Sequence, residues 1–402
     1  MPKVTIREID KTSGGEVSYL DYTVLVPGMQ VEGLTGLWED ANLFKAAFKL
    51  AAVKEDADMG IIAAYQLLKQ GLSVYYVGID EFDSIEDLYK EFSDKGKYDL
   101  RFITALGFDG NEAYEEAAKY ALKCAGDRGD ACALLDIPRI ETKLSGRAFT
   151  KNIDKWAQEK LITTINDPVN RKGVEIENVD EVYGQYGALF TPYINVKIAN
   201  IDDKDKELYI PASLNYLLCF GKAIKNNAAW YAIAGSVRGV SPLLNIKPEV
   251  EFGDSDIEVL QARSVNQEED AHVAVNVVTN IRPYGQIIWG NRTMLPTTTG
   301  LKAGHFLNIR QLCTSIKKEL YRAGRQYTFE ANSDALWVNF KNEIIPLLNQ
   351  MKADQGIRGY QIIRNKTNLK ALLKATIKII PIEAVEDFDL TVELTDSIEV
   401  NE

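Results

Sequence analysis

The chain has 402 residues, and at about 150 residues per domain this length gives two to three domains with a substantial core. Its composition is 46% apolar, 26% charged and 9% aromatic, which is typical of a globular protein and excludes a largely disordered or collagen-like chain. The formal net charge of −12 argues against direct nucleic-acid binding, because an acidic surface repels phosphates.

Cysteine usage and hydropathy indicate the cellular compartment in which the chain folds. Four cysteines lie far apart and match no zinc or redox motif. They are Cys124, Cys132, Cys219 and Cys313. The sequence opens without a signal peptide and has no apolar run of about 18 residues, the length that a membrane-spanning helix needs. We therefore expect buried thiols in a reducing cytosol, with neither secretion nor membrane insertion.

The first third of the chain changes from strand patterns to a helix and strand alternation. Residues 3–9 alternate around Val4, Ile6 and Ile9, and a second strand is expected over 19–26. The helices expected next cover 60–70, 84–94 and 112–125, and the strands cover 72–77, 100–106 and 131–137. Alternating helices and short apolar strands predict a parallel sheet covered by helices.

The middle of the chain has a weaker pattern. Residues 249–270 are acidic and are expected to form a loop. The helices expected here cover 153–161, 214–226, 305–323 and 335–351, and the strands cover 193–199, 273–281 and 286–290.

The last 50 residues divide by charge. Residues 355–382 carry bases and no acid, whereas residues 383–402 carry acids and no base. Strands are expected over 376–382 and 388–394, and the second alternates through Phe388, Leu390, Val392 and Leu394. On a helix, Lys366, Lys370 and Lys374 would share one face, which is either a solvated face or a docking face for an acidic partner.

Catalytic motifs are absent from the sequence. The two histidines, His272 and His305, belong to no metal or catalytic spacing and are expected in surface or capping roles. No phosphate loop, GxGxxG or GxSxG motif occurs, and the turn after strand 72–77 is acidic where a pyrophosphate would lie. We expect no catalytic, cofactor-binding or metal-binding residue, although a soluble cytosolic α/β enzyme built on 60–137 remains the alternative.

Three ordered blocks lie in the last third of the chain, at 288–294, 308–312 and 327–337. In this order they resemble the WG-x-R-T, v-R-R and F-E-x-N-x-x-x-L-W motifs of contractile tail sheath proteins. The matching residues outside the middle block are Trp289, Gly290, Arg292, Thr293, Phe329, Glu330, Asn332 and Trp337. Residues 4–9, 132–138 and 377–384 also resemble the family, whereas residues 28–60 fit it poorly.

The resemblance implies a multi-domain α/β (α+β) fold with an outer α/β domain and an inner mixed α/β domain. The segments implied are an N-terminal arm and strand over 1–25, an outer domain over 26–285, an inner domain facing a tube over 286–385, and a C-terminal strand arm over 386–402. In the family, six-membered rings of subunits stack as a helical sleeve around an inner tube, and the sleeve contracts to drive the tube through a cell envelope. The implied partners are further copies of the chain, the tube protein, and baseplate and tail terminator proteins, without nucleic acid.

The implied location is a virion tail assembled in the host cytoplasm; the alternative is the sheath of a bacterial contractile injection device or bacteriocin. The residue pattern itself supports assembly at one point. A terminal strand with an apolar face and no local partner promotes aggregation unless it pairs with another sheet. We therefore predict that the residues of the two arms are exchanged between subunits, and that Lys366, Lys370 and Lys374 face the tube. The predicted arm residues are Val4, Ile6, Ile9, Phe388, Leu390, Val392 and Leu394.

Overall fold

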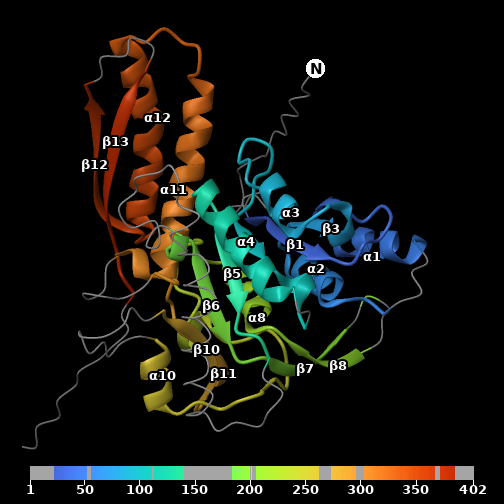
Figure 1. Ribbon diagram of the computed structural model, residues 1–402. Helices are drawn as coiled ribbons and strands as arrows, with labels where there is room; N and C mark the ends of the chain where they lie inside the picture. The colour runs from blue at the N-terminus through green and yellow to red at the C-terminus, as the bar shows by residue number, and fades with distance from the viewer. Residues whose placement is uncertain are drawn as a thin grey trace, which may run out of the picture.

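The computed structural model describes residues 22–51, 56–110, 113–139, 183–199, 201, 205–261, 273–295, 303–366 and 372–384. These residues form a main body around a large sheet and a C-terminal unit of two long helices and a strand hairpin (Figure 1). The predicted arm strands at 4–9 and 388–394 and the predicted helix at 153–161 lie outside the described residues.

The main body is built on an eight-stranded sheet of order β11-β10-β6-β5-β4-β1-β3-β2. The neighbouring strands from β3 to β10 are parallel, and short antiparallel strands β2 and β11 form the two edges. The strands are β1 (Val24–Gly28), β2 (Gly36–Trp38), β3 (Val74–Gly78), β4 (Phe102–Thr104), β5 (Cys132–Asp136), β6 (Gly187–Thr191), β10 (Val275–Ile281) and β11 (Gly285–Trp289). The predicted parallel, helix-covered sheet is confirmed.

Helices cover both faces of this sheet, and a separate apolar cluster lies on each face. Helices α2 and α8 contribute to one cluster, and α3, α4 and α10 contribute to the other. The helices of the main body are α1 (Ala41–Leu50), α2 (Met59–Gln70), α3 (Ile85–Glu91), α4 (Tyr114–Arg128), α8 (Ala212–Ala223), α9 (Gly235–Arg238) and α10 (Asp254–Leu260). A small antiparallel sheet of β7 (Ile194–Ala199), β8 (Asp205–Ile210) and β9 (Lys247–Pro248) lies beside them.

Local sequence signals explain where these helices begin and end. The Asp58 carboxylate accepts the Ile61 N–H at 2.9 Å as the N-cap of α2, and Gly71 ends the helix with a left-handed φ of 91°. Nine residues of α2 are buried, because the helix is covered by α8 as well as by the sheet.

The C-terminal unit consists of α11 (Leu307–Gln326), α12 (Asp334–Ala353), β12 (Ile357–Asn365) and β13 (Lys374–Pro381). Figure 1 shows α11 against the main body, α12 beside it, and the hairpin on the far side of α12. A third apolar cluster, which includes Ile316, Ile344, Leu348 and Ile357, holds these layers together.

Three predictions are corrected. The inner domain does not begin at 286, because β11 pairs with β10 in the main sheet. Residues 254–260 form helix α10 rather than an acidic loop; Asp254 and Asp256 lie in its first turn, where acids favour a helix. Residues 357–365 and 374–381 form an antiparallel hairpin, so Lys366 and Lys374 do not lie on a helix, and Lys370 is outside the described residues.

Close packing of glycines fixes the centre of the sheet. A Cβ added at Gly60 would lie 2.3 Å from the carbonyl oxygen of Pro27, and one added at Gly107 would lie 2.2 Å from the same oxygen. The first turn of α2 and the turn after β4 therefore pack directly against the backbone of β1 at Pro27 and Gly28.

We expect Gly60→Ala and Gly107→Ala each to lower the free energy of unfolding by about 1–3 kcal/mol, because the new methyl group has no space. Gly324→Ala in α11 is the matched control, since nothing lies within 4 Å of its added Cβ, and it should stabilise by about 0.5–1 kcal/mol. Urea denaturation measures all three; unchanged stability of the first two variants would contradict the packing argument.

Candidate assembly surface

The hairpin of the C-terminal unit is a sheet with only two strands. Among the described residues no third strand pairs with either β12 or β13, although the strands contain nine and eight residues. An isolated two-stranded sheet is marginally stable, and its outer edges present unpaired backbone N–H and C=O groups. This hairpin can therefore accept a further strand on each edge.

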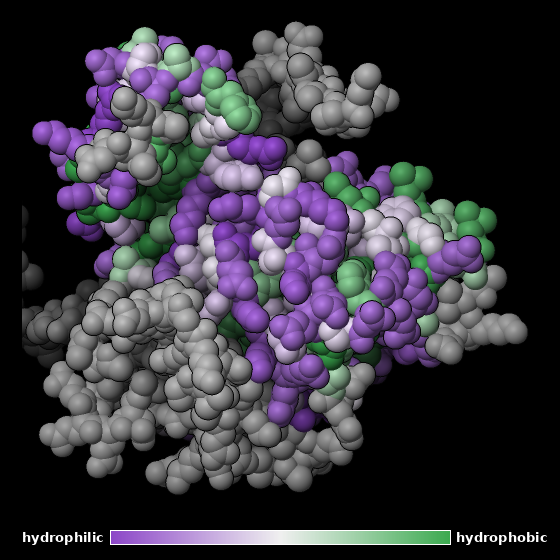
Figure 2. Space-filling model, turned by 45° about the horizontal axis from the view of Figure 1, so that its top comes forward, coloured by the Kyte–Doolittle hydropathy of each residue, from purple (hydrophilic) through white to green (hydrophobic). Residues whose placement is uncertain are grey.

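The two faces of the hairpin differ in chemistry. Tyr360, Ile362, Ile377 and Ile379 pack against the apolar cluster of α11 and α12. The opposite face carries the pairs Gln361 with Lys378, Ile363 with Thr376, and Asn365 with Lys374. Hydrophobic residues are visible on the C-terminal unit in Figure 2, while the helices over the main sheet are largely hydrophilic outside.

Both ends of the described chain lie beside the C-terminal unit. At the start, the Arg101 guanidinium lies 5.3 Å from the ring centroid of Tyr22, and it donates to the backbone oxygen of Gln311 at 3.0 Å on α11. At the end, the Ile382 N–H donates to the Gly356 oxygen at 3.0 Å, just before β12. The predicted arm residues continue from these two points, outside the described residues.

The first motif block forms the joint between the main sheet and α11. The Asn276 side chain of β10 accepts the Arg292 N–H at 2.8 Å and donates to the Arg292 oxygen at 2.9 Å. Gly290 follows Trp289 with a φ of 152°, and a Cβ there would lie 2.7 Å from the Asn276 Oδ1. The Thr293 N–H donates to the oxygen of His305, so this block leads directly into α11.

Further contacts that the sequence analysis missed secure the same joint. Asn291 and Asn308 exchange two hydrogen bonds of 2.7 and 3.0 Å. The Trp230 indole N–H donates to the oxygen of Asp354 at 3.3 Å, where α12 ends. Asparagines inside apolar segments are a usable signal for such bonds, but their partners come from distant parts of the chain.

His305 is buried rather than on the surface, and His272 lies outside the described residues.

The third motif block, 327–337, lies at the opposite end of the C-terminal unit. Phe329 is fully exposed and has a left-handed φ of 76°, a conformation that favours glycine. The Asn332 amide donates to the Leu372 oxygen at 3.4 Å, and Arg364 contacts both Asp334, at 2.6 Å, and the Trp337 ring. Glu330 lies in the same turn. The structure thus brings this block close to the hairpin loop that begins at Lys366 and ends before Lys374.

The carboxyl edge of the main sheet is the other candidate site, because open α/β sheets bind ligands where the strand order reverses. That point lies between β1 and β4, where the backbone packing of Gly60 and Gly107 fills the space. At the end of β5 the Asp136 carboxylate is buried and accepts the Ser213 N–H at 2.8 Å and the Ser213 hydroxyl. The protein's own groups therefore occupy this edge.

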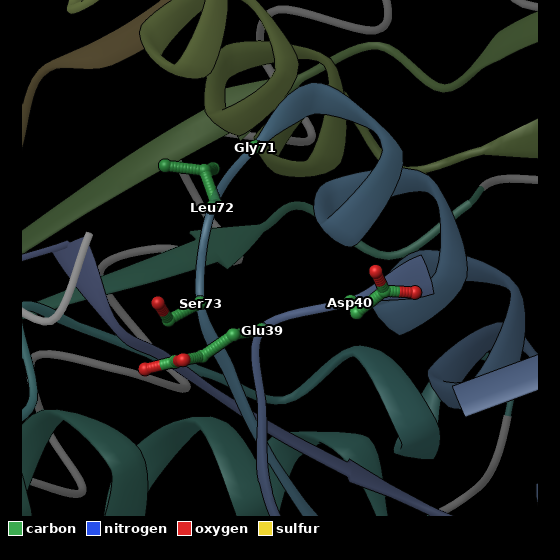
Figure 3. Close-up of a pocket in the computed structure, with 5 residues that line it drawn as sticks. All are labelled: Glu39, Asp40, Gly71, Leu72 and Ser73. Atoms are coloured by element: carbon green, nitrogen blue, oxygen red, sulfur yellow. The ribbon is translucent and has the colours of Figure 1, made fainter. Parts of the chain in front are cut away.

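A cavity also lies beside the start of α1. A cavity of about 410 Å³ is lined by Glu39, Asp40, Gly71, Leu72 and Ser73, and Figure 3 shows Asp40 apart from Glu39 and Ser73. The Asp40 carboxylate caps α1 by accepting the Asn42 N–H at 2.7 Å.

Within the described ranges, no three His, Cys, Asp or Glu side chains are grouped to hold a metal ion. A search of those same ranges finds no helix with the length and apolarity that crossing a bilayer requires.

The Asp136 carboxyl group links the stability of the fold to pH. Burial raises its pKa to about 7, and the hydrogen bonds from Ser213 oppose this rise. Because the pKa in the folded state exceeds that in the unfolded state, the folded protein binds the extra proton and loses this contribution as pH rises towards 7.

We expect the stability of Asp136→Asn relative to the parent to rise by about 1 kcal/mol for each pH unit between pH 5 and 7. Asparagine resembles the protonated carboxyl group, since its oxygen can accept the Ser213 N–H and its amide can donate to the Ser213 hydroxyl. Urea denaturation at several pH values measures the difference; parallel curves for the two proteins would contradict it.

Comparisons with known proteins agree with the motif blocks. No protein-family model matches the chain. The tail sheath protein of Vibrio phage KVP40 is 24% identical over 284 residues, which cover 66% of this chain and 37% of that protein. The tail sheath protein of Enterobacteria phage T4 is 21% identical over 280 residues, which cover 69% of this chain and 38% of that protein. The match thus spans less than two fifths of these curated relatives.

Solved structures match over nearly the whole chain. A chain of the contracted sheath complex of the extracellular contractile injection system PVC has a TM-score of 0.63 at 14% identity, covering 99% of this chain and 98% of that chain. A chain of the contracted helical sheath of the anti-feeding prophage has a TM-score of 0.61 at 15% identity, covering 98% and 99%. The chain therefore has the fold of contractile sheath proteins, and the resemblance predicted from its motifs is confirmed.

Proposed function

We propose that this chain, which shares the sequence motifs and fold of contractile tail sheath proteins, is the structural subunit of a contractile sheath. Its copies polymerise as a helical sleeve of six-membered rings around an inner tube, and the sleeve contracts to drive the tube through a target cell envelope. The observation that carries this proposal is the two-stranded hairpin, whose outer edges pair with no other described strand, in a chain whose described part begins and ends beside the C-terminal unit.

Strand exchange would link the subunits. The N-terminal arm of one copy and the C-terminal arm of another add strands to the hairpin of a third, which satisfies its open edges. Such a contact joins two different surfaces, so it does not close between two copies and instead propagates into a ring or helix. In this arrangement the outer domain is the main body up to 295, and the inner domain is the C-terminal unit from 303.

Contraction in this proposal is a change of packing between subunits, with the arms as tethers. Arg101, Asn291 and Trp230 tie the main body to the C-terminal unit, which favours motion of the subunit as one body. The step needs no nucleotide, in agreement with the filled switch point of the main sheet. We propose no catalytic activity, and the enzyme alternative gains no support from this edge.

The kind of particle to which the sheath belongs is also part of the proposal. The tail of a virion and a bacterial injection device or bacteriocin both remain candidates, because the relatives come from phages and from injection systems. A baseplate partner is supported by the similarity, at a TM-score of 0.62, to a chain in the anti-feeding prophage baseplate structure. Particles with DNA-filled heads would indicate a virion, and headless particles a device.

We expect deletion of residues 1–12 to leave a folded monomer that cannot polymerise, because the N-terminal strand is lost. Ile6→Lys should have the same effect, since it places a charge on the apolar face of the strand, whereas the neighbouring Thr5→Lys should still assemble. Electron microscopy and sedimentation distinguish these outcomes. Long sleeves built by the truncated protein would refute strand exchange by this arm.

A tube contact by lysines remains a second prediction. With no helix at Lys366 and Lys374, these two lysines lie at the loop end of the hairpin, beside the third motif block. We expect Lys366→Glu with Lys370→Glu to impair assembly on the inner tube at low salt, because exposed ion pairs are screened as salt rises. Lys222→Glu on α8 is the control, and equal assembly of both proteins would contradict the contact.

A further inference from the structure

One loop of the main body contacts α11 through polar side chains. The loop spans residues 92–101, between α3 and β4. At its end, the Arg101 guanidinium donates to the Gln311 side chain at 2.9 Å and to the Gln311 backbone oxygen at 3.0 Å. The apolar residues on the same stretch of α11, Leu312 and Ile316, belong instead to the cluster shared with α12 and β12. Polar contacts therefore hold α11 on this loop.

Asp99 lies in the same loop, between two cations of α11. Its carboxylate accepts a hydrogen bond from Arg322 at 3.0 Å and another from Lys318. The Lys318 side chain is 5% exposed, and no other described carboxylate forms an ion pair with it. Asp130 is also near Lys318, but Arg128 binds it at 3.0 Å. Burial favours a higher pKa for Asp99, yet the two cations outweigh this effect and lower the pKa, so the carboxylate stays charged.

A second group of contacts between the two units lies at the start of α11. Asn291 and Asn308 exchange their hydrogen bonds there, and the Trp230 indole reaches the Asp354 oxygen at the end of α12. Lys318 lies about 17 Å further along the helix, at a rise of about 1.5 Å per residue. The first contacts thus form a pivot at one end of the C-terminal unit, and the contact with Asp99 acts at a distance from this pivot.

Exposure decides which of the more distant contacts fixes the helix. Lys317 donates to the Gly129 oxygen at 2.8 Å, but it is exposed, so water can replace this bond. The side chains of Asp99 and Arg322 are each 44% exposed and keep part of their hydration. Lys318 is buried, and its charge would be uncompensated without the carboxylate. Lys318 therefore stays against the loop only while Asp99 is charged.

We propose that Asp99 is a latch residue, whose ion pairs with Lys318 and Arg322 fix the angle between the main body and the C-terminal unit. Loss of these pairs lets the C-terminal unit rotate about the start of α11 with both units still folded. The buried members of its apolar cluster all come from α11, α12 and β12, so rotation does not divide them. The described chain passes between the units once, after Leu295. This inference concerns a single subunit and goes beyond the proposed sheath function.

Spin labels on the two units measure this angle as a distance. In a Cys313→Ser background, labels at Glu116→Cys on α4 and Lys341→Cys on α12 lie at exposed positions on either side of the joint. The three other cysteines are buried and should stay unlabelled. Dilution of the labelled chain into an excess of unlabelled chain limits double electron–electron resonance to distances within one subunit.

Asp99→Asn should widen the distance distribution by about twofold, because the neutral amide leaves the Lys318 charge uncompensated. The circular dichroism spectrum should match that of the parent, since both units remain folded. The matched control is Asp334→Asn, which breaks an exposed ion pair with Arg364 inside the C-terminal unit and should leave the width unchanged. An unchanged width in Asp99→Asn, or a loss of its helix signal, would overturn the proposal.

A second substitution tests whether charge is the cause. Asp99→Asn combined with Lys318→Met should restore the narrow distribution, because methionine has a similar length and carries no charge to bury. A combined variant as broad as Asp99→Asn would refute the latch. Arg322→Gln removes an exposed partner and should widen the distribution by less; an unchanged width there would also count against the latch. None of these measurements requires a sleeve, so their failure leaves the proposed function standing.

Discussion

The open edges of one short sheet constrain the rest of this molecule. Strands β12 and β13 pair only with each other among the described residues, and their inner face is fastened to α12 through residues such as Ile362 and Ile377. The backbone groups on the outer edges are left for solvent or for another strand. A chain that maintains such a sheet on a rigid support is suited to polymerise.

The support is α11, a helix of 20 residues that belongs to both units. Its first half is buried against the main body through polar contacts, including the bonds of Arg101 to Gln311 and of Asn291 to Asn308. Buried hydrogen bonds are directional, so they fix the helix in one orientation more strictly than apolar packing does. A force on the hairpin is therefore transmitted to the whole subunit.

Sequence patterns predicted most strands of the main sheet but not β2 or β6, because most of these strands are buried on both faces and stand out as apolar runs between helices. They missed β12 at 357–365 and suggested a helical face at 366–374, where lysines are spaced by four, although the strand expected over 376–382 is confirmed by β13. Ile362 and Ile363 favour a strand at 357–365, and Lys366 and Lys374 lie at the loop ends of the two strands. The joint was missed because Asn276 and Arg292 meet only in the folded chain.

The main body shows how a sheet with the strand order of ligand-binding folds can serve as a scaffold. Ligand sites in such sheets depend on an empty crevice at the point where the strand order reverses. Here Gly60 and Gly107 bring two backbone segments against Pro27, and Asp136 caps α8 through Ser213. Each of these contacts fills space that a ligand would otherwise occupy. The consequence is a stiffer body, which suits the proposed role of a subunit that keeps its shape while its packing against neighbouring copies changes.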